Sequence, residues 1–210
     1  QTYQVVEQPV HFYNAAKAFG RFQKLLNDFP ADELYETIPN FHHTLKRFEA
    51  LKKAVAENKA GRKEEVAAEI AFAMEREKDV SILVELIAEK KIPLRVTHND
   101  TKFNNIMIDD ASGEGICVID LDTVMPGSLL YDYGDSLRFG TNPASEDEKD
   151  LTKVYMDIEL FEQFSKGFIE EMGSTLTKTE REFMPFSAKL MTFECGIRFL
   201  TDYLEGDHYF

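Results

Sequence analysis

A single break in hydrophobic periodicity constrains the fold of this chain more than any other feature. Before Pro93, apolar residues recur at helical spacing and predict helices over residues 12–29, 42–58, 63–78 and 82–87. Pro30 and Pro93 follow the first and the last of these stretches, where a helix would have to end. We therefore expect residues 1–93 to be mainly helical.

After Pro93 the sequence changes to short runs of β-forming residues. Residues 94–97, 105–108 and 116–119 each read as a strand, and the segment 109–115 is rich in turn formers. This pattern predicts a β-hairpin within residues 94–126. Helices are expected again over residues 129–139, 151–172 and 177–204, with Pro185 and Gly196 as candidate breaks in the last one.

The predicted elements form one unit of the mainly α class with a small β-hairpin. A chain of 210 residues is long enough to bury one sizeable core. Its parts are a helical segment (1–93), the hairpin region (94–126) and a second helical segment (127–210). The first residue is Gln1, and the residues after it read as the tail of a strand or linker, so we expect the chain to begin partway through a longer protein.

Charge and composition argue against several classes of partner. The formal net charge of −14 disfavours nucleic acid, and the basic residues are interleaved with glutamates on predicted helical faces. We find no signal-peptide pattern and no apolar run of membrane-spanning length. Cys117 and Cys195 lie in apolar contexts without metal-ligand spacing, which predicts buried free thiols and a cytoplasmic, reducing location.

The segment from His98 to Asn105 carries the pattern H-x-D-x-x-x-x-N, which is typical of the catalytic loop of kinases. Lys102 stands two residues after Asp100, as in protein serine/threonine kinases. The hairpin would return the chain so that Asp120 comes beside the end of this loop. The spacing therefore predicts a phosphoryl-transfer centre between residues 98 and 122.

Phosphoryl transfer needs a carboxylate near the attacking hydroxyl, oxygen ligands for Mg²⁺ and positive charge near the phosphoryl group. Asp100 would accept the hydroxyl proton, and Lys102 would balance charge on the ATP γ-phosphate. Asn105 and Asp120 offer the hard oxygens that Mg²⁺ prefers. His98 is expected to support the site by ordering the loop through hydrogen bonds.

Each of these residues also has a purely structural interpretation. Asp100 and Asn105 could form turn hydrogen bonds, and Asp120 could cap the next element. Asp109 and Asp110 are assigned to the hairpin tip on that basis. A catalytically silent module that binds a sugar or a partner is a further alternative, although Asp100, Asn105 and Asp120 are all present.

Several stretches resemble the aminoglycoside phosphotransferase and choline kinase superfamily, and within it the N-acetylhexosamine 1-kinases most closely. They are VTHND at residues 96–100, NNIM at 104–107 and VIDLDT at 118–123, with further similarity at 125–135 and 194–199. The resemblance covers most of the chain. It implies the helical C-terminal lobe of a protein-kinase-like fold.

The resemblance also implies roles for individual residues. Asp100 would be the catalytic base, Asn105 and Asp120 the metal ligands, and Asp132 a structural carboxylate that accepts backbone N–H groups of the catalytic loop. The acceptor would be an amino sugar, and the expected substrate-binding residues are Asp100, Asp122, Thr123, Phe139, Arg198 and Tyr209. For Arg198, a structural ion pair within an apolar helix is an equal alternative.

Proteins of this superfamily carry an N-terminal lobe that clamps the nucleotide, and its strand sheet and phosphate-covering loop are not found before Gln1. We therefore expect the isolated chain to be inactive and the parent protein to phosphorylate the anomeric hydroxyl of an N-acetylhexosamine with ATP. A choline, homoserine or aminoglycoside kinase is the alternative within the same chemistry.

Overall fold

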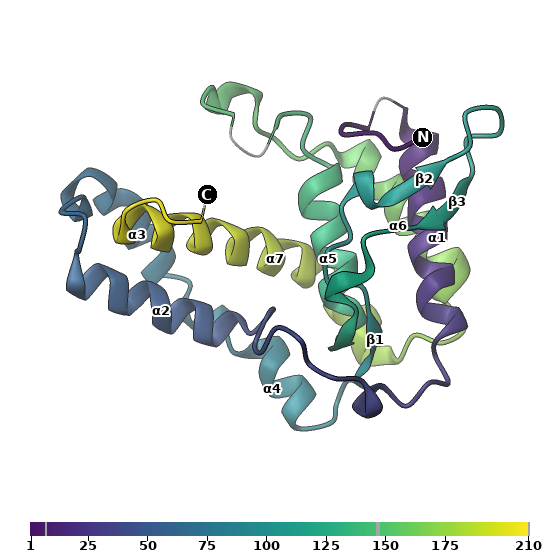
Figure 1. The fold of residues 1–210 in the computed structure, drawn as a ribbon, viewed down its shortest axis with the longest axis horizontal. Helices are drawn as coiled ribbons and strands as arrows, with labels where there is room; N and C mark the ends of the chain where they lie inside the picture. The colour runs from purple at the N-terminus through teal and green to yellow at the C-terminus, as the bar shows by residue number, and fades with distance from the viewer. Residues whose placement is uncertain (7, 146–147, 210) are drawn as a thin grey trace.

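The computed structural model describes residues 1–6, 8–145 and 148–209. Its helices are α1 (Pro9–Leu25), α2 (Thr44–Glu57), α3 (Ala67–Met74), α4 (Ile82–Ala88), α5 (Leu129–Gly140), α6 (Ile158–Met172) and α7 (Lys178–Glu205), and its strands are β1 (Arg95–Thr97), β2 (Ile106–Ile108), β3 (Gly115–Val118) and β4 (Met125–Gly127). Helix α1 packs along α6, while α7 packs on α5 and then on α2 (Figure 1). The predicted mainly α class is confirmed.

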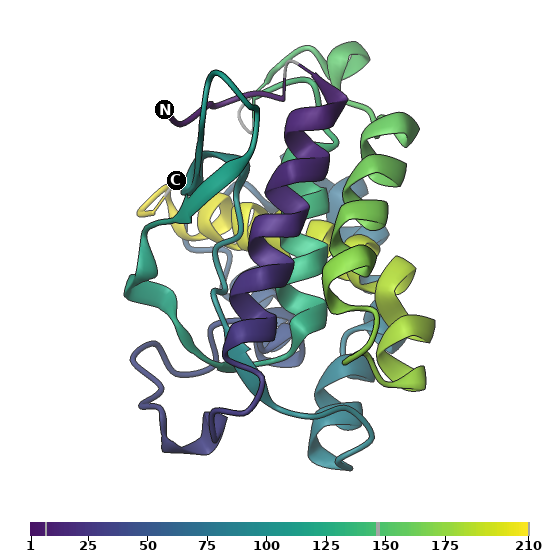
Figure 2. The ribbon, with the colours of Figure 1, turned by 90° about the vertical axis from the view of Figure 1, so that its right-hand side faces the viewer.

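The predicted β-hairpin is formed by β2 and β3. The strands are antiparallel, with Met107 opposite Cys117, and the turn contains Gly113 at φ 70°. The hairpin lies against α1 (Figure 2). A second antiparallel pair, β1 with β4, was not predicted, because β4 is three residues long and contains Pro126.

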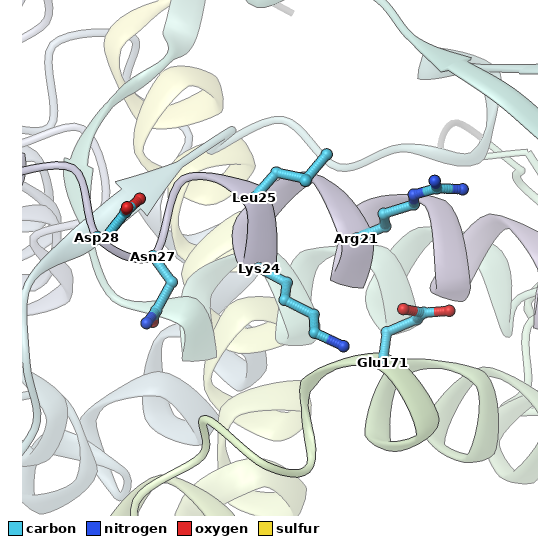
Figure 3. A pocket seen from close by; sticks show the side chains of 6 residues that line it. All are labelled: Arg21, Lys24, Leu25, Asn27, Asp28 and Glu171. Carbon is cyan, nitrogen blue, oxygen red and sulfur yellow. The ribbon is translucent and has the colours of Figure 1, made fainter.

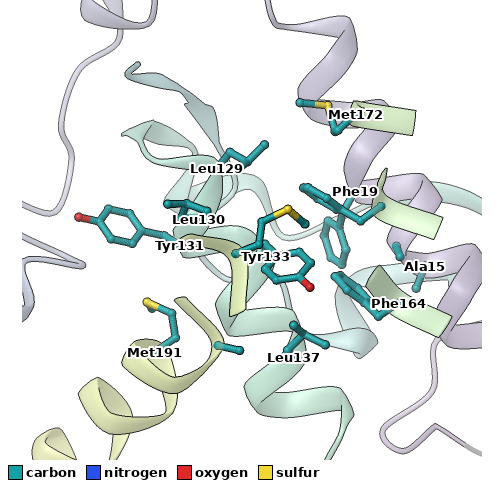
Figure 4. Close-up of a cluster of buried hydrophobic side chains, with 14 of the residues drawn as sticks. Ala15, Phe19, Leu129, Leu130, Tyr131, Tyr133, Leu137, Phe164, Met172 and Met191 are labelled. Atoms are coloured by element: carbon teal, nitrogen blue, oxygen red, sulfur yellow. The ribbon is translucent and has the colours of Figure 1, made fainter. Parts of the chain in front are cut away.

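The main core lies between α1, α5, α6 and the first half of α7. Figure 4 shows side chains from these helices meeting, among them Phe19, Tyr133 and Phe164. Phe12 and Phe164 pack with ring centroids 4.6 Å apart, and Phe12 contacts Phe103 of the catalytic-loop segment edge to face at 6.0 Å. The loop is therefore anchored directly on the main core.

A second, smaller core lies at the other end of α7. It joins α2, α3 and α7 through Phe48, Leu51, Ala54, Ala73, Val80, Ile197 and Leu204. Helix α7 thus runs from the main core to this second core and connects the two. The capping box of Thr177 and Glu180 starts the helix, and Gly206 in the left-handed region ends it.

Two predicted helices differ from the observed ones. The helix expected over residues 63–78 is a 3₁₀ turn (Lys63–Val66), then α3, then another 3₁₀ turn (Glu77–Asp79). The helix expected over 151–172 begins only at Ile158, after a separate 3₁₀ turn (Leu151–Lys153). Asp157 explains the late start, because its carboxylate accepts the N–H groups of Glu159 and Leu160 at 2.9 and 3.2 Å.

Helix α7 is continuous through both candidate breaks. Pro185 lies inside the helix on its exposed side, where water can satisfy the carbonyl that loses its N–H partner. Gly196 is also exposed and helical. The prediction of a broken helix at either position is wrong.

The expectation of buried thiols is also wrong: Cys117 is exposed and Cys195 is partly buried. Cys117 lies opposite Met107, which is 37% exposed, on the outer face of the hairpin. Successive residues of a strand face opposite sides, so a hairpin that lies on α1 leaves this face to solvent. Among the residues that the structure describes, no helix combines the length and apolar character needed to cross a membrane.

Candidate active site

The catalytic-loop segment, residues 98–105, connects β1 to β2 and ends in a 3₁₀ turn (Phe103–Asn105). β1 is fixed by its pairing with β4, and the Thr97 hydroxyl donates to the Met125 backbone oxygen at 3.0 Å. A Cβ at Gly127 would collide with the Thr97 side chain, so the two strands approach as closely as glycine allows. The loop therefore begins from a rigid position.

Asp100 is the centre of a group of three side chains. Asn105 Nδ2 donates to the Asp100 backbone oxygen at 2.8 Å and to Oδ2 at 3.2 Å. Lys102 Nζ lies 3.2 Å from Asp100 Oδ1, and the two side chains are 33% and 25% exposed. The 3₁₀ turn produces this grouping by folding Asn105 back toward Asp100. The carboxylate is thus held from two sides and still reaches solvent.

Asp120 approaches the group from the other strand of the hairpin. The Ile119 N–H donates to the Asn105 backbone oxygen at 3.0 Å, so the chain reaches Asp120 one residue after this contact. Asp120 is exposed, with φ 61° and ψ 58°. A non-glycine residue adopts this left-handed conformation at a cost of roughly 1 kcal/mol, and such strain is concentrated at functional sites.

Asn105 and Asp120 offer ligands that fit Mg²⁺. Because Asn105 Nδ2 bonds to Asp100, its amide oxygen is the atom suited to a cation, and the Asp120 carboxylate is exposed. No cluster of three or more His, Cys, Asp or Glu suited to a metal occurs among the described residues. Two protein oxygens with water and phosphate oxygens suit Mg²⁺, which usually retains several waters.

Asp132, near the start of α5, joins the catalytic loop to the core. Its Oδ2 accepts the His98 N–H at 2.9 Å, and its Oδ1 accepts the Asn99 N–H at 2.7 Å. Gln23 of α1 donates to Oδ2 as well, at 2.5 Å. Burial raises the pKa of the Asp132 carboxyl, while these donors and the nearby His98 partly offset that rise. The Asp132 carboxylate thus accepts two N–H groups of the loop, in the place that backbone carbonyls take in a helix or sheet.

His98 is buried, and both of its ring nitrogens are engaged within the site. Nε2 lies 2.8 Å from the Ile119 backbone oxygen, and Nδ1 accepts the Asp100 N–H at 3.3 Å. The carbonyl can only accept, so Nε2 carries the proton. This arrangement links the loop to the residue before Asp120 and gives His98 an ordering position rather than that of a proton acceptor for substrate.

The residues expected to bind substrate lie in different surroundings. Asp122 is exposed in the 3₁₀ turn Leu121–Thr123, whereas Thr123 is buried and its hydroxyl donates to the His98 backbone oxygen at 2.7 Å. Phe139 is partly buried against the main core. Near the end of α7, the Arg198 guanidinium lies 5.8 Å from the centroid of the Tyr209 ring. The structure therefore groups Arg198 with Tyr209, and Thr123 with the catalytic loop.

A buried contact that sequence reasoning missed joins the catalytic loop to α7. His42 Nε2 lies 2.8 Å from the Asn99 backbone oxygen, and His42 Nδ1 lies 2.8 Å from Glu194 Oε1. The side chains of His42 and Glu194 are 6% and 1% exposed. No local signal could have paired them, because 152 positions separate them in the chain.

Two surface cavities differ in their relation to this site. The larger, about 430 Å³, lies between the end of α1 and α6, is lined by Arg21, Lys24, Leu25, Asn27, Asp28 and Glu171, and contains none of the predicted site residues (Figure 3). The other, about 290 Å³, is mostly apolar and is lined by His42 and Asn99 together with residues of α4 and β4. The second cavity lies behind the catalytic loop.

The loop, the hairpin and the bracing Asp132 carboxylate together form the candidate active site. Residues 3–155, more than half of the chain, match the phosphotransferase enzyme family. The chain belongs to this family. The match includes Asp100, Lys102, Asn105, Asp120 and Asp132 and ends before α6 and α7.

Proposed function

We propose that this protein phosphorylates a small alcohol with ATP and Mg²⁺, and that the acceptor is the anomeric hydroxyl of an N-acetylhexosamine. The product would be a sugar 1-phosphate. Family membership supports phosphoryl transfer, and the sequence resemblance supports the amino sugar. The observation that carries the proposal is the partly exposed Asp100 carboxylate, held between Lys102 and Asn105 on a braced loop.

Asp100 would orient the acceptor hydroxyl and take its proton as the oxygen attacks phosphorus. Lys102, 3.2 Å from Asp100, would stand beside the phosphoryl group and offset its negative charge. Because Asn105 already donates to Asp100, it keeps the carboxylate in one orientation before substrate arrives. Bond formation to the acceptor oxygen and loss of its proton would then occur at a prearranged carboxylate.

Asn105 and Asp120 would hold Mg²⁺, which in such sites neutralises phosphate charge and orients the transferring group. The left-handed backbone at Asp120 supports this role, because such strain is concentrated at functional sites and the carboxylate is exposed. On the acceptor side, Asp122, Thr123 and Arg198 are the proposed sugar contacts, with Phe139 and Tyr209 as walls. Arg198 would supply positive charge and donors for sugar oxygens.

The proposal is tested with the full-length protein and Asp100→Asn. We expect kcat to fall by roughly 10²- to 10⁴-fold, because the variant keeps the shape of the side chain and loses the proton acceptor. Asp109→Asn is the matched control, since Asp109 lies at the hairpin tip and its carboxylate accepts hydrogen bonds from the turn residues Ala111 and Ser112. ATP consumption near the wild-type rate in Asp100→Asn would show that the base is wrongly assigned.

A panel of acceptors tests the substrate. N-Acetylhexosamines should stimulate ATP consumption, and ³¹P NMR should show a phosphate at the anomeric carbon. The net charge of −14 would also suit a cationic acceptor, although the acidic residues are spread along the chain, so choline, homoserine and an aminoglycoside form the second arm of the panel. Sugar binding without any ATP consumption would identify the silent binding module.

A further inference from the structure

The ring of His42 lies between two oxygen acceptors. The Asn99 carbonyl oxygen is 2.8 Å from Nε2, and Glu194 Oε1 is 2.8 Å from Nδ1. Glu194 Oε2 also accepts the Thr44 hydroxyl at 2.5 Å. A carbonyl and a carboxylate both accept, so this geometry is satisfied only when the imidazole carries a proton on each nitrogen or shares one with Glu194. His42 and Glu194 therefore form one protonated, buried unit.

The position that His42 holds is an unusual one. Asn99 has φ 65°, a left-handed conformation that asparagine adopts more readily than most non-glycine residues. Its N–H bonds to Asp132, and its side-chain amide donates to the Thr123 backbone oxygen at 2.9 Å. The carbonyl is held by His42. Every polar group of this residue is thus engaged, and two of them depend on titratable side chains: the N–H on Asp132 and the carbonyl on His42.

The Asn99 carbonyl and the Asp100 N–H belong to one planar peptide group. Fixing the carbonyl oxygen on His42 therefore fixes the direction of the Asp100 N–H, which donates to His98 Nδ1 at 3.3 Å. Rotation of this plane would turn the Asp100 side chain away from Lys102 and Asn105. His42 acts on Asp100 through one peptide bond.

We propose that His42, held by Glu194, is a positioning residue that keeps Asp100 in its reactive orientation and links the catalytic loop to α7. This inference rests on the proposed role of Asp100 as the base. Arg198, a proposed sugar contact, stands one helical turn after Glu194 on the same helix. The same helix therefore carries both the support for the base and a group for the acceptor.

The surroundings of His42 favour its charged form. The ring faces Glu194 of α7, Asp135 and Tyr131 of α5, the neighbouring Phe41, and the Asn99 carbonyl. Thr44 of α2 contributes indirectly, because its hydroxyl donates to Glu194. Burial lowers the pKa of His42, but the hydrogen bond and charge of Glu194, the charge of Asp135 and the Asn99 bond together raise it above the value of a free histidine. The contact of the charged His42 ring with Glu194 and the Asn99 carbonyl, here called the His42 clamp, should therefore weaken as pH rises above the raised pKa of His42.

Kinetics of the full-length protein test the proposal. His42→Gln should lower kcat on the order of 10- to 100-fold, because a displaced base loses alignment with its substrate, and it should leave the KM for ATP unchanged. The double variant His42→Gln/Glu194→Gln offers a neutral pair in which one amide donates to Asn99 and accepts from the other. This double variant should recover most of kcat. Its kcat should also not show the fall at alkaline pH that loss of the His42 proton causes in the wild type.

Glu180→Gln is the control for lost stability, because it disrupts another buried ion pair of α7 without touching the loop. The proposal is overturned if His42→Gln reduces kcat per folded molecule no more than this control does. It is equally overturned if the double variant keeps this fall in kcat at alkaline pH.

A measurement on the unmodified protein does not depend on any variant folding. In NMR titrations, the His42 ring and the Asp100 amide should shift with the same midpoint, and independent midpoints would contradict the clamp. This readout also separates the two proposals. If Asp100→Asn stays active but the two resonances titrate together, the clamp is real and the assigned base is wrong.

Discussion

Each half of α7 is tied to the chain around the catalytic loop by a buried ion pair, and the two pairs differ in kind. Near the first end, Arg95 of β1 donates to Glu180 through Nε at 2.8 Å and Nη2 at 2.9 Å. In the second half of the helix, His42 bonds to Glu194 at 2.8 Å. The first pair fixes the strand that leads into the loop, and the second fixes the loop itself.

The two pairs differ in the side chain that carries the positive charge, which is an arginine in one and a histidine in the other. An arginine guanidinium stays protonated throughout the pH range in which proteins fold, and its planar fork fits a carboxylate with two bonds. A histidine loses its charge near neutral or mildly alkaline pH. The permanently charged pair, Arg95 with Glu180, therefore holds the strand before the loop. The titratable pair, His42 with Glu194, holds Asn99, the residue directly before the proposed base.

Breaking the permanent pair should have the largest effect on stability. Glu180→Gln leaves the Arg95 guanidinium buried without a counter-charge, and we expect the free energy of unfolding to fall by about 3–5 kcal/mol in urea denaturation. Thr177→Ala is the control: it removes the capping hydroxyl, keeps the ion pair and should cost about 1 kcal/mol. Equal losses in the two variants would show that Glu180 acts as a cap alone.

The titratable pair should make stability depend on pH. The folded state raises the pKa of His42, so the charged ring binds its proton more tightly in the folded than in the unfolded chain. Its stabilising contribution is complete below the usual histidine pKa and is lost as pH rises through the raised value. The difference in unfolding free energy between wild type and His42→Gln should therefore narrow with increasing pH.

Denaturation of both proteins at several pH values from about 6 upward measures this difference. Glu180→Gln provides the comparison, since its difference from wild type should stay constant over the same range. If the difference in unfolding free energy between wild type and His42→Gln does not change with pH, the ring contributes to stability by packing alone.

The two pairs also mark the limit of what the sequence could predict. Periodicity placed α1, α2 and α7 to within a few residues, because each buries one face of a helix. Helix α5 also lies where it was expected, although nearly all of its residues are buried. The hairpin was predictable because its turn is local. His42 with Glu194, and Arg95 with Glu180, join distant segments, and each residue alone looks like an ordinary polar residue on a helix or strand.

The candidate site divides in the same way. Asp100, Lys102, Asn105 and Asp120 were found from one short pattern and the hairpin that follows it. The contacts that hold the loop, from Asp132, Thr123 and His42, depend on how α5, the turn before β4 and the start of α2 pack. Only the Asp132 contact was expected, and that expectation came from the resemblance. Spacing reveals groups in one local unit, whereas packing partners need the fold.

A third ion pair on α7, between Lys189 and Asp79, gives the smallest expected effect on stability. Lys189 Nζ lies 2.7 Å from Asp79 Oδ2, as close as the buried pairs, but the lysine side chain is 59% exposed. Water already solvates such a charge, and an exposed pair contributes about 0.2–1 kcal/mol. Lys189→Met, measured by urea denaturation, should therefore cost less than 1 kcal/mol or so. A loss as large as that of Glu180→Gln would mean that distance rather than burial determines what each pair of α7 contributes.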